Sequence, residues 1–252
     1  MHPVLIEIGP FTIYSFGFFL ASAFLLGIAW TMREARLRNL DERLALDIGF
    51  YVLVGGLLGA RISFAVFNPH LFFSDPWSLF KLWTGGLIFM GGAFTAAMFM
   101  VFFLRLKKQP ILAWLDAAAP GAALGLFLGW LGCLASGCGY GMPAELLWSI
   151  TFTHPHAAGP LFTPLHPTQA YHALAALACF VFILSIKGNF HVQGRLAGAF
   201  LIMYSLLGML IDHLRADIQA ELYFLSLNQA GGVAGVVAGL VLFYVPAKTW
   251  KG

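Results

Sequence analysis

Long apolar segments alternate with short polar ones along almost the whole chain. A helix that crosses the hydrocarbon core of a bilayer needs about 20 consecutive, mostly apolar residues. Segments that meet this requirement, and that we predict to be transmembrane helices, are residues 11–31, 45–67, 85–104, 111–132, 168–186, 196–214 and 229–246. The pattern predicts an all-α integral membrane protein with about seven spans. We expect residues 1–252 to form a single polytopic membrane domain.

The composition supports this interpretation. Of 252 residues, 60% are hydrophobic and only 10% are charged, whereas a soluble domain has roughly 25% charged residues. The net charge is +3, and no basic run is interleaved with aromatic residues to follow a phosphate backbone. We therefore expect no nucleic-acid partner. The first residues, Met1–Val4, lack the positive charge of a cleavable signal peptide, so the first span should be retained.

The basic residues predict an orientation, because loops rich in Lys and Arg stay in the cytoplasm. Eleven of the 14 basic residues follow the first, third, fifth and seventh predicted spans: Arg33, Arg36, Arg38, Arg43, Arg105, Lys107, Lys108, Lys187, Arg195, Lys248 and Lys251. The amino end is thus predicted outside the cytoplasm and the carboxyl end inside it. The longest outside connection, residues 133–167, contains no Lys or Arg.

Four charged residues are expected at membrane depth, where a charge is costly and is usually kept for function or pairing. Asp212 and Arg215 are three apart, so they share a helix face and can form an ion pair. Alternatively, Asp212 acts as a base or orients a nucleophile. Arg61 either holds a lipid phosphate or pairs with an acid. Asp116, near the cytoplasmic side, is expected to contribute to helix-start capping or polarity.

The segment from His166 to Tyr171 opens the fifth span at the outer face. Pro167 suits the first turn of a helix, whose free N–H groups and positive dipole end can bind an anion. His166, Gln169 and Tyr171 add hydrogen-bond donors there. Glycines recur at every fourth position in two other spans, which lets helix backbones approach closely. These are Gly121, Gly125 and Gly129, and Gly231, Gly235 and Gly239.

The cysteines leave two interpretations open. Three cysteines are too few for a disulfide framework and lack the paired spacing of a zinc site. Cys133 and Cys138 either form a disulfide or pack simply, or one of them is a nucleophile. Cys179 is interpreted as a small core residue. No histidine pair has metal-site spacing, so we expect neither a metal nor another cofactor.

Together these segments resemble the prolipoprotein diacylglyceryl transferase family over nearly the whole chain. The His166–Gln169 segment with Tyr171 is the most specific feature. The resemblance also rests on the segments Ile8-Gly9-Pro10, Gly59-Ala60-Arg61, Gly85-Gly86 to Gly91-Gly92, Asp116 with Pro120, Gly132 to Gly141, Tyr204 with Asp212 and Arg215, and Gln229.

The resemblance implies a multi-pass enzyme of the bacterial inner membrane. It would move a diacylglyceryl group from phosphatidylglycerol to the lipobox cysteine of a lipoprotein precursor. The implied lipid- and phosphate-binding residues are Arg61, Arg215, Gln169, Tyr171 and Gln229. His166 or Asp212 would take the proton from the attacking thiol, and His166 is favoured because its ordinary pKa lies near 6.5.

The chain departs from the family pattern where the family keeps its working residues. Where the family has the motif His-Gly-Gly, this chain has Met90-Gly91-Gly92. Trp130 stands in place of one family arginine, and Gly208 stands in place of the arginine four residues before the acidic residue, which is Asp212 here. Where the family's glycine-rich signature has an asparagine and a glutamate, this chain has Cys133 and Cys138. Two alternatives therefore stay open: a different lipid or acyl transferase using Cys138 or Cys133, and a noncatalytic protein that binds phospholipid or lipoprotein.

Overall fold

The chain is described from a computed structural model that defines residues 2–8, 11–74, 77, 86–217, 221–222 and 225–244. Among these residues, seven helices are long and apolar enough to cross a membrane, as predicted. They are α1 (Ser15–Leu37), α2 (Leu44–Phe67), α4 (Phe89–Leu106), α5 (Ile111–Ser136), α6 (Thr168–Ile186), α7 (Arg195–Asp212) and α8 (Leu227–Tyr244). Some positions used above lie outside the described residues: Gly9, Pro10, Gly85, Lys248 and Lys251.

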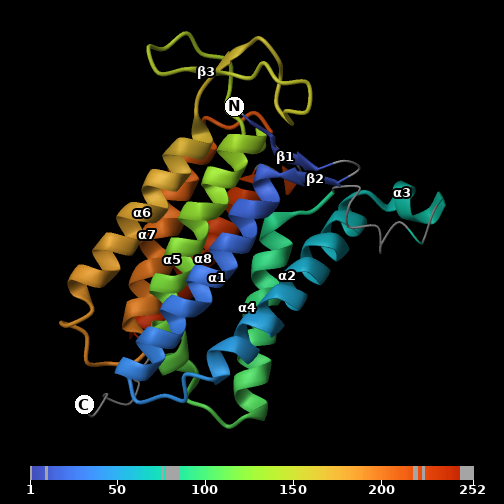
Figure 1. Cartoon of the computed structure of the whole chain (residues 1–252). Coiled ribbons are helices and arrows are strands. Elements are labelled where there is room, and N and C mark those ends of the chain that lie inside the picture. Colours follow the sequence, from blue (N-terminus) through green and yellow to red (C-terminus); the bar gives the residue numbers. More distant parts are fainter. Residues whose placement is uncertain are drawn as a thin grey trace.

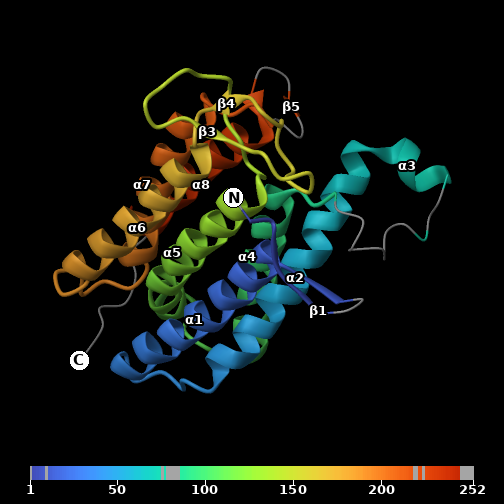
Figure 2. The same cartoon turned by 45° about the horizontal axis from the view of Figure 1, so that its top comes forward.

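The first predicted span begins too early. Residues Phe11–Tyr14 form a strand, β2, which pairs antiparallel with β1 (Val4–Ile8). The helix α1 starts at Ser15, whose side-chain hydroxyl donates to the carbonyl oxygen of His2. A short helix, α3 (Pro69–Ser74), follows α2 and projects away from the other helices (Figure 2).

The helices alternate in direction, so their connections gather at two ends of the bundle (Figure 1). The α1–α2, α4–α5 and α6–α7 connections share one end, and the long α5–α6 connection lies at the other. The described basic residues of the three short connections therefore lie together. They include Arg38, Arg43, Lys107, Lys108 and Lys187. This is the charge separation on which the predicted orientation depends.

The main helix pairs are α1 with α5, α2 with α4, α7 with α8, and α5 with α6. Glycine permits the closest approaches: a Cβ atom on Gly121 would lie 2.5 Å from the carbonyl oxygen of Gly27 in α1. Likewise, a Cβ on Gly239 would lie 2.8 Å from the carbonyl oxygen of Gly198 in α7. The predicted packing role is confirmed at these positions. It is wrong for Gly129, where an added Cβ would meet no described atom within 4 Å.

Two buried carboxylates bind neighbouring helices at the end that carries the short connections. Asp116 accepts hydrogen bonds from the backbone N–H groups of Gly194 and Ala197, each at 2.8 Å. Its predicted capping role is confirmed, but the helix that it caps is α7 rather than its own. Glu34, which is 2% exposed, lies 2.8 Å from the Nζ atom of Lys187 and so joins α1 to the end of α6.

The α5–α6 connection folds over the opposite end of the bundle. Its strands β3 (Ile150–Thr151) and β4 (Pro164–Leu165) pair antiparallel. Residues 140–143 lie between β4 and the segment that follows α7, through bridges from Gly141 to Arg215 and from Pro143 to Leu165. A second hairpin, β5 (Glu221–Leu222) with β6 (Leu225–Ser226), precedes α8. The connection thus fixes the backbone of Arg215.

Candidate functional site

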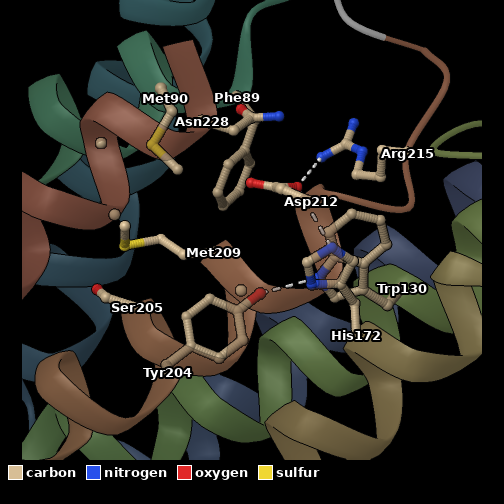
Figure 3. Close-up of a pocket in the computed structure, with 13 residues that line it drawn as sticks. Phe89, Met90, Trp130, His172, Tyr204, Ser205, Met209, Asp212, Arg215 and Asn228 are labelled. Atoms are coloured by element: carbon tan, nitrogen blue, oxygen red, sulfur yellow. Dashed lines mark hydrogen bonds and ion pairs between the residues drawn. The ribbon is translucent and has the colours of Figure 1, made fainter. Parts of the chain in front are cut away.

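A cavity of about 60 Å³ lies near the end of the bundle that carries the α5–α6 connection. Residues from α4, α5, α6, α7 and α8 line it (Figure 3). Phe89, Met90 and Met209 make an apolar side, whereas Asp212 and Arg215 lie at a polar side. The cavity therefore places charged groups beside an apolar surface within the helix bundle.

Arg215 is held by two carboxylates. Its Nη1 atom lies 3.1 Å from Oδ1 of Asp212, which confirms the predicted ion pair. Its Nε and Nη2 atoms donate to the two carboxylate oxygens of Asp217 at 2.9 and 3.1 Å. Burial acts to lower the pKa of Arg215, but hydrogen bonds and charges from Asp217 and Asp212 outweigh it and raise this pKa. The guanidinium is thus a permanent cation beside the cavity.

An aromatic stack forms the wall next to this ion pair. The rings of Trp130 and His172 are parallel within 6°, and their centroids are 4.0 Å apart. Trp130 donates from Nε1 to the hydroxyl of Tyr204 at 2.9 Å, and the Arg215 guanidinium lies 5.6 Å from the Trp130 ring. His172 Nε2 is 3.6 Å from Oδ1 of Asp212. Trp130 is therefore held by the stacked imidazole, the nearby guanidinium and the hydrogen bond at its edge.

His172 was not among the predicted site residues, although it is a titratable side chain within the first turns of a predicted transmembrane helix. That criterion selected Asp212 and Arg215, and it would have selected His172 as well. The partner Trp130 lies on another helix, and no periodicity within either segment indicates the contact.

The His166–Tyr171 segment binds the α5–α6 connection. Thr168 donates from its hydroxyl to the carbonyl oxygen of Gly139 at 2.6 Å, and Gln169 donates from Nε2 to that of Cys138 at 2.8 Å. The Tyr171 hydroxyl accepts from Trp148 Nε1 at 2.7 Å. His166 is half-buried and donates from its backbone N–H to the carbonyl oxygen of Met142. None of His166, Gln169 and Tyr171 lines the described cavity.

Arg61 and Gln229 have identifiable structural contacts elsewhere. Arg61 is buried and donates from Nη1 to the carbonyl oxygen of Gly86 at 3.1 Å. The side-chain oxygen of Gln229 accepts from the backbone N–H of Ser226, and the Ser226 hydroxyl accepts from the backbone N–H of Gln229. This reciprocal pair is a capping box at the start of α8. Lipid binding by Arg61 and Gln229 stays a prediction.

Cys133 and Cys138 form a disulfide between the end of α5 and the turn after it. The structure thus shows the first of the two interpretations of these cysteines. A bridged cysteine has no thiolate, which is the nucleophilic form, so catalysis by Cys138 or Cys133 would first require reduction. Cys179 is buried as a free thiol, as expected for a core residue.

The departures from the family pattern converge on the cavity. Met90, Trp130 and Gly208 come from three helices, and all three line it together with Asp212. A Cβ atom on Gly208 would lie 4.0 Å from Cε1 of His172, so the missing side chain leaves space beside the imidazole. Positions where the resemblance implies a histidine, two arginines and an acid therefore surround one space. This convergence identifies the cavity as the candidate active site.

Comparisons with known proteins cover nearly the whole chain. A family model described as prolipoprotein diacylglyceryl transferase matches residues 3–245. The chain is 30% identical to a phosphatidylglycerol–prolipoprotein diacylglyceryl transferase of Aeromonas hydrophila, over 98% of this chain and 90% of the relative. It is 31% identical to the enzyme of that name in Idiomarina loihiensis, over 95% and 91%. For Clostridium tetani the identity is 26%, over 97% and 98%.

Proposed function

The chain belongs to the prolipoprotein diacylglyceryl transferase family, and from this we propose that it transfers a diacylglyceryl group from phosphatidylglycerol to a lipoprotein precursor. The sulfur of the lipobox cysteine bonds to the terminal glycerol carbon of the diacylglyceryl group. The bond from that carbon to the phosphate oxygen breaks, and glycerol phosphate leaves with the electron pair. The thiol proton needs an acceptor, and the leaving phosphate needs a nearby cation.

One observation carries the proposal beyond the overall similarity: the cavity joins an ion pair to an apolar surface within the bundle. Met90, Phe89 and Met209 provide the apolar surface that acyl chains require, and Arg215 provides a cation near the phosphate. Arg215 can shift its hydrogen bonds from the carboxylate of Asp212 to phosphate, since both match its planar fork. We assign lipid binding to Arg215. Roles in the reaction for His166, Arg61, Gln169, Tyr171 and Gln229 stay predictions.

The seven apolar helices make this a multi-pass membrane protein. We place it in the bacterial inner membrane as one polytopic domain, with the α5–α6 connection and the cavity toward the outside. The support is the collection of basic residues in the three short connections at the other end of the bundle. In this orientation the site meets lipoprotein precursors as they emerge from the membrane.

Purified protein, phosphatidylglycerol with labelled acyl chains and a lipobox peptide test the proposal. We expect label on the peptide, and none on a peptide whose cysteine is replaced by Ser. The Aeromonas hydrophila relative serves as the positive control. Label on the cysteine peptide with the Aeromonas hydrophila enzyme, but not with this protein, would contradict the proposal.

A noncatalytic function is the second candidate, because Met90, Trp130 and Gly208 replace residues that the resemblance implies for catalysis. It predicts that the protein retains phosphatidylglycerol or the peptide through purification while transferring no label. Turnover of any lipid would exclude it.

A further inference from the structure

We propose that His172, oriented by Asp212, accepts the proton of the attacking lipoprotein thiol. This inference rests on the proposed function and deepens it. The sequence alone favoured His166 or Asp212 for this step, but His166 does not line the described cavity. His172 does line it, on the wall formed by the Trp130 stack (Figure 3).

The surroundings of His172 distinguish it from an ordinary core histidine. It is 3% exposed, yet neither ring nitrogen has a hydrogen-bond partner among the described residues. Buried polar side chains are nearly always hydrogen-bonded, so an imidazole in this state needs an explanation. A ring nitrogen reserved for a transferred proton provides one.

Asp212 faces the imidazole in the position of an orienting carboxylate. The distance from Nε2 to Oδ1 is 3.6 Å, slightly longer than a hydrogen bond, and such contacts often tighten only when substrate binds. With Nε2–H directed at Asp212, Nδ1 carries the lone pair that takes the proton. The carboxylate then stabilises the imidazolium that forms.

The other charged and titratable groups near His172 permit this step. Arg215 is paired with both Asp212 and Asp217, and the Tyr204 hydroxyl accepts a hydrogen bond from Trp130. Asp212 itself is engaged in the ion pair with Arg215. Among the described residues that line the cavity, His172 is the only imidazole. It is therefore the best-placed neutral base.

The absence of a side chain at Gly208 gives the thiol access. A Cβ atom there would lie 4.0 Å from Cε1 of His172, so a long side chain would occupy the space next to the imidazole. In the reaction the carbon–sulfur bond forms, the carbon–oxygen bond to phosphate breaks, and the thiol proton moves to His172. The imidazolium returns the proton to glycerol phosphate or water, so atoms and charges balance.

The test compares His172→Gln with His213→Gln, whose ring is at the exposed end of α7 and bonds the carbonyl oxygen of Met209. Transfer by the wild type requires a neutral imidazole, so its kcat should fall as pH decreases through the imidazole pKa. In His172→Gln we expect kcat to fall by about 100-fold or more and KM for phosphatidylglycerol to be unchanged. The decrease of kcat toward low pH, the acidic limb of the pH–rate profile, should disappear. His213→Gln should keep the wild-type rate and limb.

The possible failures are distinguishable. A wild type that transfers no lipid would refute the proposed function. The assignment of His172 alone would be overturned if the wild-type protein is active and His172→Gln keeps an unaltered acidic limb. It would also be overturned if the limb is lost in His166→Gln instead. If His172→Gln does not fold, Asp212→Asn replaces it. Loss of the facing carboxylate makes the imidazole less basic, so the limb should move to lower pH, and an unmoved limb would overturn the assignment.

Discussion

Glu34 illustrates how single charged residues stabilise this apolar bundle far from the cavity. Its carboxylate is 2% exposed and contacts Lys187 at 2.8 Å and Arg33 at 3.2 Å. The two cations differ in setting, because the side chain of Arg33 is 55% exposed and that of Lys187 is 29% exposed. A buried carboxylate deprived of its partner is strongly destabilising, whereas an exposed ion pair contributes little.

We therefore expect Lys187→Ala to lower the free energy of unfolding in detergent by about 2 kcal/mol. Arg33→Ala, the matched control, should lower it by less than about 1 kcal/mol. Thermal unfolding of the purified variants measures both. Equal losses would show that Glu34 does not depend on Lys187.

Pairs close in the sequence could be predicted, and pairs across helices could not. The ion pair of Asp212 and Arg215 could be predicted from their spacing of three residues, although Arg215 lies just after the end of α7. The contact of Glu34 with Lys187 joins residues 153 positions apart, and that of Trp130 with Tyr204 joins residues 74 apart. Such contacts depend on how the helices pack, which apolar periodicity does not specify.

Among the elements, the helices were predictable because crossing a bilayer requires long apolar segments. The hairpin of β1 and β2 was not, since Phe11–Tyr14 is as apolar as the helix that follows it. The structural role of the α5–α6 connection emerges only from the fold. This connection links the disulfide, the first turn of α6 and the backbone of Arg215.

The disulfide stabilises this connection, and removing it tests whether Cys133 and Cys138 are structural or catalytic. A bridge closing so short a loop contributes about 2 kcal/mol in the chain-entropy model. Cys133→Ser and Cys138→Ser should each destabilise the protein by that amount, and both should keep transferring lipid at similar rates. Loss of turnover in one variant alone would instead support that cysteine as a nucleophile. Maleimide should label the wild-type pair only after reduction.

The basic connections and the candidate active site lie at opposite ends of the molecule. The basic connections lie at one end, and the cavity with the α5–α6 connection lies at the other (Figure 1). This separation could be predicted in outline from the alternation of basic residues. The cavity could not, because five helices contribute to it.

An impermeant maleimide tests the orientation in intact cells. The native cysteines are shielded, two by their bridge and Cys179 by burial. We expect Ala158→Cys in the α5–α6 connection to react at once, and Arg43→Cys to react only after the membrane is opened. The reverse order would place the site in the cytoplasm and refute the proposed orientation.

We propose that this chain catalyses diacylglyceryl transfer although Met90, Trp130 and Gly208 stand where the resemblance implies a histidine and two arginines. The most direct measurement is the mass of a lipobox reporter in bacteria depleted of their own transferase and supplied with this protein. We expect a reporter whose cysteine carries a diacylglyceryl thioether. An unmodified reporter, in cells whose membranes contain the folded protein, would refute catalysis by this chain.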